Sequence, residues 1–241
     1  MPKIGPVAED VVNQVAGMAR AGLQRMARPS LNSVMVRLMD LAIDGVGKLP
    51  SVKQMAAKHL EKRGNPELAI EAATQSHLLI AAAQGVVTNI GGLLSAIVGT
   101  PVNLTAVIVV QIRLVACVAH LRGYDIDDPR LRTAIAMCLL GESELRRQVQ
   151  SGRLPSSPLA VATSPVMDPG LRVSVTDSVL NHSLTDAAGK GLITTLGRKT
   201  PVIGGGVGGI ADWYGTRSVA RCARGQFIDR RLAPITRYPQ E

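Results

Sequence analysis

The chain of 241 residues carries 27 Lys and Arg against 18 Asp and Glu, a formal net charge of +9, and 46% of its residues are hydrophobic. This length and apolar content suffice for one substantial core or two modest ones. The positive charge favours an anionic partner, either nucleic acid or an acidic membrane surface, and is also typical of a basic, solvated surface. One Phe, one Trp and three Tyr are too few for the stacking platforms of single-stranded nucleic-acid binders, and no DNA-binding motif occurs, so the sequence disfavours a nucleic-acid partner.

The start of the chain and the cysteines bear on the compartment. Glu9 and Asp10 precede only a weak apolar stretch, which does not fit a secretory signal. Three cysteines, Cys117, Cys138 and Cys222, lie far apart in apolar helical patterns. They have no metal-binding spacing, so we expect them to be reduced and buried in a cytoplasmic protein.

Helical patterns begin near the N-terminus. Apolar residues at helical spacing predict one helix over Val7–Ala27 and a second that starts after Ser30 and ends at Gly45 and Gly47. We therefore expect residues 1–46 to form N-terminal amphipathic helices, packed as one unit with a helical domain over residues 47–241.

Two strong helix signals follow. Ser51 predicts the start of a short basic helix that runs to Lys62 and is closed by Gly64. Asn65-Pro66 then predicts a new helix start, because the asparagine can cap the helix and proline needs no N–H partner in the first turn.

The most informative stretch runs from Ala72 to Ile112 and contains no Asp, Glu, Lys or Arg. Gly99-Thr100-Pro101 divides it into two apolar arms, each close to the roughly 20 residues that span a bilayer. Polar side chains in these arms are costly in hydrocarbon, so we favour a helical hairpin buried in a bundle, with interfacial insertion or a constitutive span as alternatives. The polar residues form a predicted buried cluster of Gln84, Asn89, Asn103, Gln111 and Arg113.

The next segment holds a turn, a helix and a loop. Asp128 and Pro129 repeat the cap-plus-proline signal and predict a helix that continues towards Gln150. Residues 151–170 contain four prolines and four serines, which predicts a mobile loop. The acidic turn at 125–128 lacks the glycine and closing glutamate of a calcium loop, so we expect no metal there.

A last helix is predicted from Thr200-Pro201 onwards. Its small residues recur every three or four positions on one face, which favours close packing against another helix in a glycine zipper: Gly204, Gly208, Ala211 and Gly215. A phosphate-binding loop is the disfavoured alternative, because the preceding strand and the Lys-Ser/Thr pair are missing.

The same helix carries a basic stripe. Arg217, Arg221 and Arg224 recur at helical spacing, and the candidate residues for binding an anionic surface are Arg217, Arg221, Arg224, Arg230 and Arg231. A stripe of this kind is also typical of a solvated helix face.

Three stretches, Gly47–Gln75, Gly85–Arg132 and Pro201–Phe227, together resemble the EcsC protein family of bacteria. The strongest part comprises Gly91-Gly92, Pro101, Gln111-Ile112-Arg113 and the Gly-Tyr-Asp-x-Asp-Asp-Pro turn at 123–129. The resemblance implies an all-helical bacterial protein from a family named for an operon that also encodes an ABC transporter. It implies no reaction and supplies no catalytic residue.

The sequence thus predicts an all-α fold, a single multi-helix bundle with a central apolar helical hairpin and a glycine-zipper C-terminal helix. It shows no catalytic motif and indicates no cofactor or metal, since the four histidines are widely separated and form no paired-ligand motif, and no GxSxG elbow occurs. Our first hypothesis is a non-enzymatic cytoplasmic accessory protein at the inner membrane face or on a transporter-type complex. The alternatives are a soluble protein-binding module or homo-oligomer, and a small-ligand carrier or unrecognised enzyme with a pocket between apolar helices.

Overall fold

The computed structural model describes residues 31–45, 47, 49–90, 101–166, 168–196 and 201–230, without the side chains of 31, 84–90, 101–105, 184, 186–196 and 201–208. These ranges hold nine helices and no strand, which confirms the predicted all-α helical bundle. The helices are α2 (Leu31–Asp44), α3 (Val52–Arg63), α4 (Pro66–Ile90), α6 (Pro101–Leu121), α7 (Pro129–Cys138), α8 (Gly141–Gln150), α9 (Pro158–Thr163), α10 (Pro169–Leu196) and α11 (Pro201–Gln226).

Local capping explains where several helices begin. The Ser51 side chain accepts from the Gln54 N–H while Gln54 reaches back to the Ser51 N–H, which is a complete capping box. Asn65 Oδ1 accepts from the backbone N–H of Glu67 at 2.8 Å, and Asp128 caps α7 in the same way. The three predicted helix starts are therefore confirmed.

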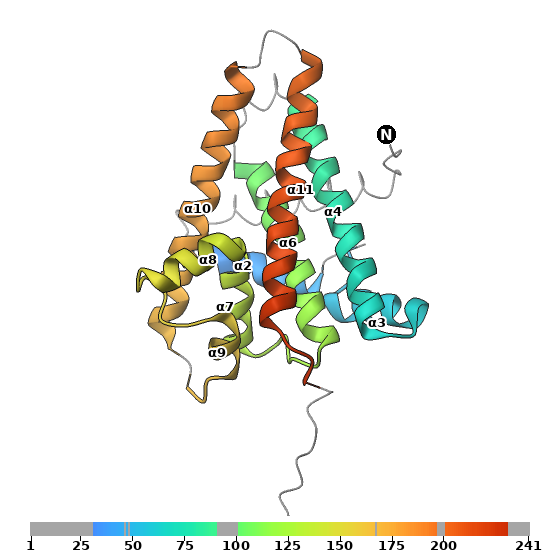
Figure 1. Ribbon diagram of the computed structural model, residues 1–241. Helices are drawn as coiled ribbons and strands as arrows, with labels where there is room; N and C mark the ends of the chain where they lie inside the picture. The colour runs from blue at the N-terminus through green and yellow to red at the C-terminus, as the bar shows by residue number, and fades with distance from the viewer. Residues whose placement is uncertain are drawn as a thin grey trace, which may run out of the picture.

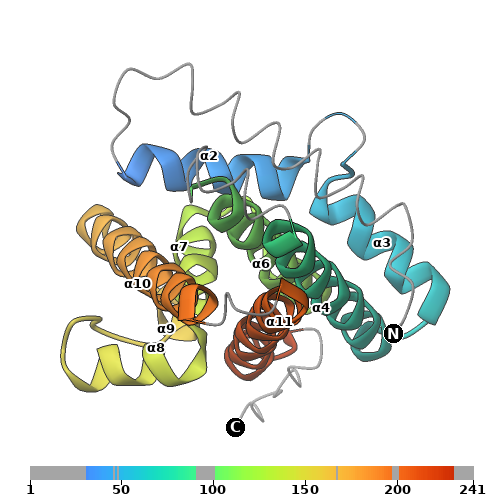
Figure 2. The same cartoon turned by 90° about the horizontal axis from the view of Figure 1, so that it is seen from above.

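Helix α6 lies in the middle of the bundle, in contact with α2, α3, α4 and α11 (Figures 1 and 2). Ile112, Leu114 and Val115 are fully buried there, as are most of the α6 side chains that follow Ala106. The described part of the second apolar arm thus belongs to the core, as the hairpin prediction requires. Among the described residues, no helix combines the length and hydropathy of a membrane span.

Helices α4, α10 and α11 extend beyond the rest of the bundle towards one end, at the top of Figure 1. The C-terminal half of α4 and the first eleven residues of α11, Pro201–Ala211, contain no Asp, Glu, Lys or Arg. The uncharged parts of these two neighbouring helices therefore gather at the same end of the molecule, away from the capped turns below.

The structure departs from two predictions about the middle of the chain. The helix expected from Pro129 to Gln150 is broken into α7 and α8, because Gly141 adopts φ +73° and the Ser218 side chain of α11 accepts a hydrogen bond from the Glu142 N–H. The segment 151–170, expected to be a loop, is non-helical over most of its described length, but it contains the short helix α9, which packs on α7. Its apolar side chains explain the packing, since Leu154, Val161 and Ala162 are buried.

Other boundaries follow the prediction. Gly45 and Gly47 both have positive φ after α2, as expected for a glycine helix end. The predicted helix over Val7–Ala27 lies outside the described residues.

Candidate functional site

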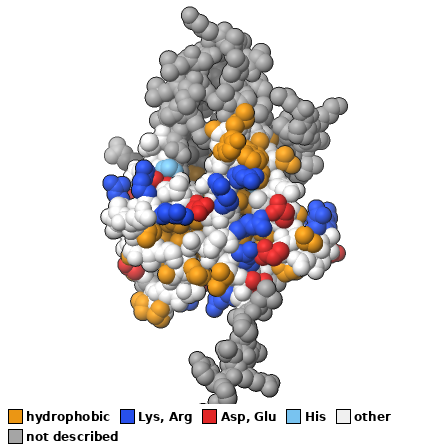
Figure 3. Space-filling model, viewed as in Figure 1, with side chains coloured by type: hydrophobic (Ala, Val, Ile, Leu, Met, Phe, Trp, Pro, Cys, Tyr) orange, Lys and Arg blue, Asp and Glu red, His pale blue; other side chains and the backbone are white. Residues whose placement is uncertain are grey.

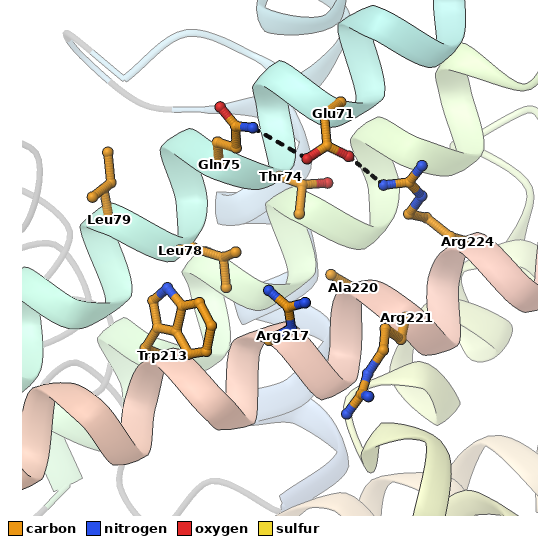
Figure 4. A pocket seen from close by; sticks show the side chains of 10 residues that line it. All are labelled: Glu71, Thr74, Gln75, Leu78, Leu79, Trp213, Arg217, Ala220, Arg221 and Arg224. Carbon is orange, nitrogen blue, oxygen red and sulfur yellow. Dashed lines mark hydrogen bonds and ion pairs between the residues drawn. The ribbon is translucent and has the colours of Figure 1, made fainter.

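A groove of about 450 Å³ runs between α4 and α11 and contains most of the described arginine stripe (Figure 4). On α11 its side chains recur at spacings of three and four, so they share one helix face, and on α4 the same spacing brings a matching set opposite. The lining residues are Glu71, Thr74, Gln75, Leu78, Leu79, Trp213, Arg217, Ala220, Arg221 and Arg224.

One end of the groove is an internal ion-pair network. Arg224 Nη1 lies 2.5 Å from Glu71 Oε2, and Gln75 Nε2 donates to Glu71 Oε1 at 3.2 Å. The hydrogen bond from Arg224 lowers the pKa of the Glu71 carboxyl. Arg224 therefore joins α11 to α4, and its charge is already matched within the protein.

The same end is closed by Arg122 at the C-terminus of α6. Its guanidinium donates to both Glu67 oxygens at 2.9 Å and to the carbonyls of Arg224 and Phe227, which are left open at the end of α11. Three helix ends are thereby fixed to one another, so this end of the groove is rigid.

Arg217 and Arg221 differ from Arg224. Both are exposed, and no carboxylate in the described part of the chain forms an ion pair with either. The Arg217 guanidinium lies 5.1 Å from the centre of the Trp213 ring in a cation–π contact. The groove thus carries two positive charges that form no ion pair among the described residues.

Apolar side chains lie next to these charges. Leu79 on α4 and Ile210 and Tyr214 on α11 are 58%, 59% and 63% exposed, and Trp213 is half-buried at the edge of the groove. In Figure 3, hydrophobic side chains gather directly above a group of Lys and Arg side chains on this face. The surface is therefore divided into an apolar part and a basic part.

The remaining predicted arginines do not contribute to this surface in the same way. Arg230 stacks over the Tyr124 ring at 5.2 Å, and its backbone N–H donates to the Arg122 carbonyl. Arg231 lies outside the described residues. Of the five predicted surface arginines, the structure brings Arg217 and Arg221 together on an open face and uses Arg224 internally.

Arg113, predicted to lie in a buried polar cluster, is buried with 4% exposure. Its guanidinium donates to the Ala42 carbonyl at 2.7 Å and to the Pro50 carbonyl at 2.8 Å. The Ala42 carbonyl belongs to the last turn of α2, where the helix dipole favours a cation. Burial lowers the Arg113 pKa to about 10, so the group stays charged at neutral pH and ties α6 to the α2–α3 connection.

The other members of that cluster do not join Arg113. Gln111 Nε2 donates to Thr216 Oγ1 of α11 at 3.4 Å, on another side of α6. The side chains of Gln84, Asn89 and Asn103 lie outside the described part. The two described members therefore serve two separate helix contacts, because positions i and i+2 of a helix do not face the same neighbour.

The predicted glycine face of α11 is only partly described. Gly215 is exposed, and a Cβ added there would meet nothing within 4 Å, so it makes no close helix contact among the described residues. Ala211 is half-buried, and the surroundings of Gly204 and Gly208 lie outside the description. The glycine zipper therefore stays a prediction, and Gly215 leaves room for another helix on this face.

Two carboxylates of the acidic turn at 125–128 have structural partners. Asp127 pairs with Lys53 at 2.6 Å, and Asp128 pairs with Arg130. Within the described ranges, no group of three His, Cys, Asp or Glu side chains could hold a metal ion. All three cysteines are free and buried, as predicted, and burial raises the pKa of Cys117 to about 12, so this thiol is not activated as a nucleophile.

Sequence reasoning missed two parts of the groove. Trp213 and Arg217 are four residues apart on α11, and this spacing could have indicated their contact. Glu71, in contrast, meets Arg224 across 153 positions of sequence, and nothing local indicates that pair.

Comparison of the chain with protein-family models, curated proteins and solved structures found no match. The resemblance to the EcsC family therefore rests on the quoted residues and remains a prediction.

Proposed function

We propose that this protein is a non-enzymatic cytoplasmic accessory protein that associates peripherally with an anionic membrane surface through the α4–α11 face. The observation that carries the proposal is the juxtaposition of two unpaired exposed arginines, Arg217 and Arg221, with Trp213 and exposed apolar side chains. Basic side chains attract acidic headgroups, whereas Trp and Tyr favour the interface between water and hydrocarbon. A transporter-type complex in such a membrane is the protein partner that fits this location.

The position of the uncharged helix ends supports one orientation of the protein on the membrane. The C-terminal half of α4 and the N-terminal part of α11 lie at one end of the bundle (Figure 1). Arg217 and Arg221 follow them along α11, so the uncharged end faces the bilayer and the arginines lie at headgroup level. Helix α6 stays in the core in this arrangement, and nothing needs to cross the membrane.

Simple energetics predict weak, reversible binding. Each arginine near an acidic surface contributes about 1 kcal/mol. Covering the exposed parts of Leu79, Ile210 and Tyr214 contributes about 1 kcal/mol each, because full burial of such a side chain contributes about 1.5–3 kcal/mol. The total of roughly 5 kcal/mol resembles that of a single myristoyl chain, and its electrostatic part weakens as salt screens the charges.

Flotation with liposomes tests this proposal. The protein should float with vesicles that contain phosphatidylglycerol at low salt, and much less at high salt or with phosphatidylcholine alone. The double variant Arg217→Glu, Arg221→Glu should abolish flotation. Lys58→Glu with Lys62→Glu is the matched control, because it makes the same charge change at exposed positions of α3. Failure of the wild type to float with acidic vesicles at low salt would refute the membrane proposal.

A second candidate is a homo-oligomer or protein-binding module. The observation that favours it is the open position of Gly215, beside half-buried Ala211 on α11, because small residues let a second helix approach closely. Gly215→Leu should then reduce the mass measured by light scattering while helicity by circular dichroism is unchanged. A wild-type protein that is monomeric at all concentrations tested would exclude the homo-oligomer.

A further inference from the structure

The α4–α11 groove changes in character along its length (Figure 4). The Arg224–Glu71 ion pair closes one end, at the right of the figure. Arg217 lies in the middle, and Leu78 and Trp213 follow at the other end. Beyond them α4 and α11 continue into their uncharged parts. The groove is therefore polar at one end and apolar at the end that opens towards the proposed bilayer side.

Arg217 is the cation that faces this groove. Figure 4 shows its side chain pointing from α11 towards α4, whereas the side chain of Arg221 points away from α4. Leu78 points towards α11 from the opposite wall, and the Trp213 ring lies beside the Arg217 guanidinium at 5.1 Å. Since Arg217 is exposed and forms no ion pair among the described residues, the groove presents one open positive charge next to apolar side chains.

Glu71 limits the charge that a ligand can carry. The pKa of its carboxyl is lowered first by the hydrogen bond from Arg224 and also by the charge of Arg217, so Arg217 and Glu71 lie within electrostatic range of each other. A dianionic headgroup at Arg217 would be repelled by this carboxylate, whereas a single carboxylate balances the one open charge. A carboxylate also matches the planar fork of a guanidinium with two parallel hydrogen bonds.

The volume of the groove distinguishes one acyl chain from two. An apolar cavity of about 150 Å³ accommodates benzene, so the groove of about 450 Å³ suits roughly eighteen non-hydrogen atoms. A saturated carboxylate of roughly sixteen carbons has this size. A phospholipid with two such chains is more than twice as large and does not fit between the helices.

We propose that the α4–α11 groove binds one long-chain carboxylate, a fatty acid, with its carboxylate on Arg217 and its chain along Leu78 and Trp213 towards the uncharged helix ends. This inference rests on the proposed function, because a face turned to the bilayer is where an acyl chain can leave the membrane and enter the groove. The protein then takes up a single acyl chain at the membrane surface.

Isothermal titration calorimetry with laurate, kept below its micelle concentration, tests the assignment. We expect one saturable site with a dissociation constant of roughly a millimolar or tighter, given the size of the ligand. Octanoate, which is four methylenes shorter, should bind at least about tenfold more weakly, because each buried methylene adds to the affinity. Dodecyltrimethylammonium, which has a chain of the same length but a cationic headgroup, should show no saturable binding.

A substitution locates the binding. Arg217→Met should weaken laurate at least about tenfold, because it removes the charged donor. Arg37→Met is the matched control, since Arg37 is also an exposed arginine within a helix, but it lies on α2 and does not line the groove. It should bind laurate as the wild type does. Both positions are exposed, so the melting temperatures without ligand should match that of the wild type.

Three results would overturn the proposal: no saturable laurate binding by the wild type, equal binding by Arg217→Met, or equal binding of dodecyltrimethylammonium. Equal or tighter binding of dihexanoylphosphatidylglycerol, a soluble phospholipid with two short chains, would also overturn it and assign the groove to a phospholipid headgroup.

Liposome flotation separates the two proposals. A protein that floats with acidic vesicles but binds no laurate keeps the proposed membrane association and loses only the fatty acid. Laurate binding that depends on Arg217, by a protein that does not float, would refute the membrane association and support the ligand.

Discussion

Acid should destabilise this protein through His77, and the size of the effect can be worked from its surroundings. His77 is buried in α4, and its Nδ1 lies 2.7 Å from the Ala73 carbonyl, so the neutral ring donates there. Burial lowers the His77 pKa from 6.5 to about 4. Below pH 6.5 the unfolded chain therefore binds a proton that the folded chain does not, and stability falls as the pH decreases.

The expected loss from this residue between pH 7 and pH 5 is about 2 kcal/mol, at up to about 1.4 kcal/mol for each pH unit. The carboxyls of Glu71 and Asp128 have lowered pKa values, so they lose their contribution at more acidic pH and hardly affect this range. His59, whose pKa burial and neighbouring cations also lower, adds to the loss in the same direction.

Urea denaturation followed by circular dichroism at pH 7, 6 and 5 measures this loss. His77→Gln serves as the comparison, because an amide can donate to the Ala73 carbonyl but does not titrate. The variant should lose about 2 kcal/mol less than the wild type over this range. His59 is unchanged in both proteins, so the difference isolates His77. Equal losses in the two proteins would refute a neutral, buried His77.

Two further perturbations test the packing around α6 and α11, each by urea denaturation. Arg113→Met should lower the free energy of unfolding by about 2–4 kcal/mol, because the carbonyls that Arg113 caps lose their donors. The control Arg221→Met should change it by less than about 0.5 kcal/mol. Equal effects of the two substitutions would contradict the buried role of Arg113. Gly141→Ala should destabilise the protein by about 1–2 kcal/mol more than Gly152→Ala. Both glycines have φ above +70°, so the backbone strain of an alanine is the same at the two positions. Only at position 141 would the new Cβ lie 2.7 Å from Ser218 Oγ. Identical losses would show that this contact relaxes freely.

Local signals in the sequence predicted the helices that local chemistry specifies. Ser51, Asn65 and Asp128 each cap the helix that their sequence pattern indicates, because a side-chain oxygen satisfies N–H groups only two or three residues away. The break before Gly141 depends instead on Ser218, which approaches from α11. No local pattern contains that information, so the helix was predicted to continue.

Composition was misleading where a few apolar side chains decide the structure. The prolines and serines of residues 151–170 favour a loop, yet Leu154 and Val161 bury themselves against the bundle and hold α9 in place. Prolines suit this segment as well as a loop, since Pro158 lies in the first turn of α9, where no N–H partner is needed.

The site was predictable in outline only. Helical spacing placed Arg217, Arg221 and Arg224 on one face correctly, but it could not reveal that Glu71 of α4 neutralises Arg224. Burial of Arg113 was also expected, whereas its carbonyl partners come from the last turn of α2 and from the α2–α3 connection, both distant in sequence.

The most direct test of the proposed membrane-facing surface uses Trp213, the one tryptophan in the chain, which lines the α4–α11 groove beside Arg217. On addition of vesicles containing phosphatidylglycerol at low salt, its fluorescence should shift to shorter wavelength and be quenched by brominated lipid, and Arg217→Glu with Arg221→Glu should remove both changes. A Trp213 spectrum that stays the same while the protein co-floats with those vesicles would contradict the assignment of this face.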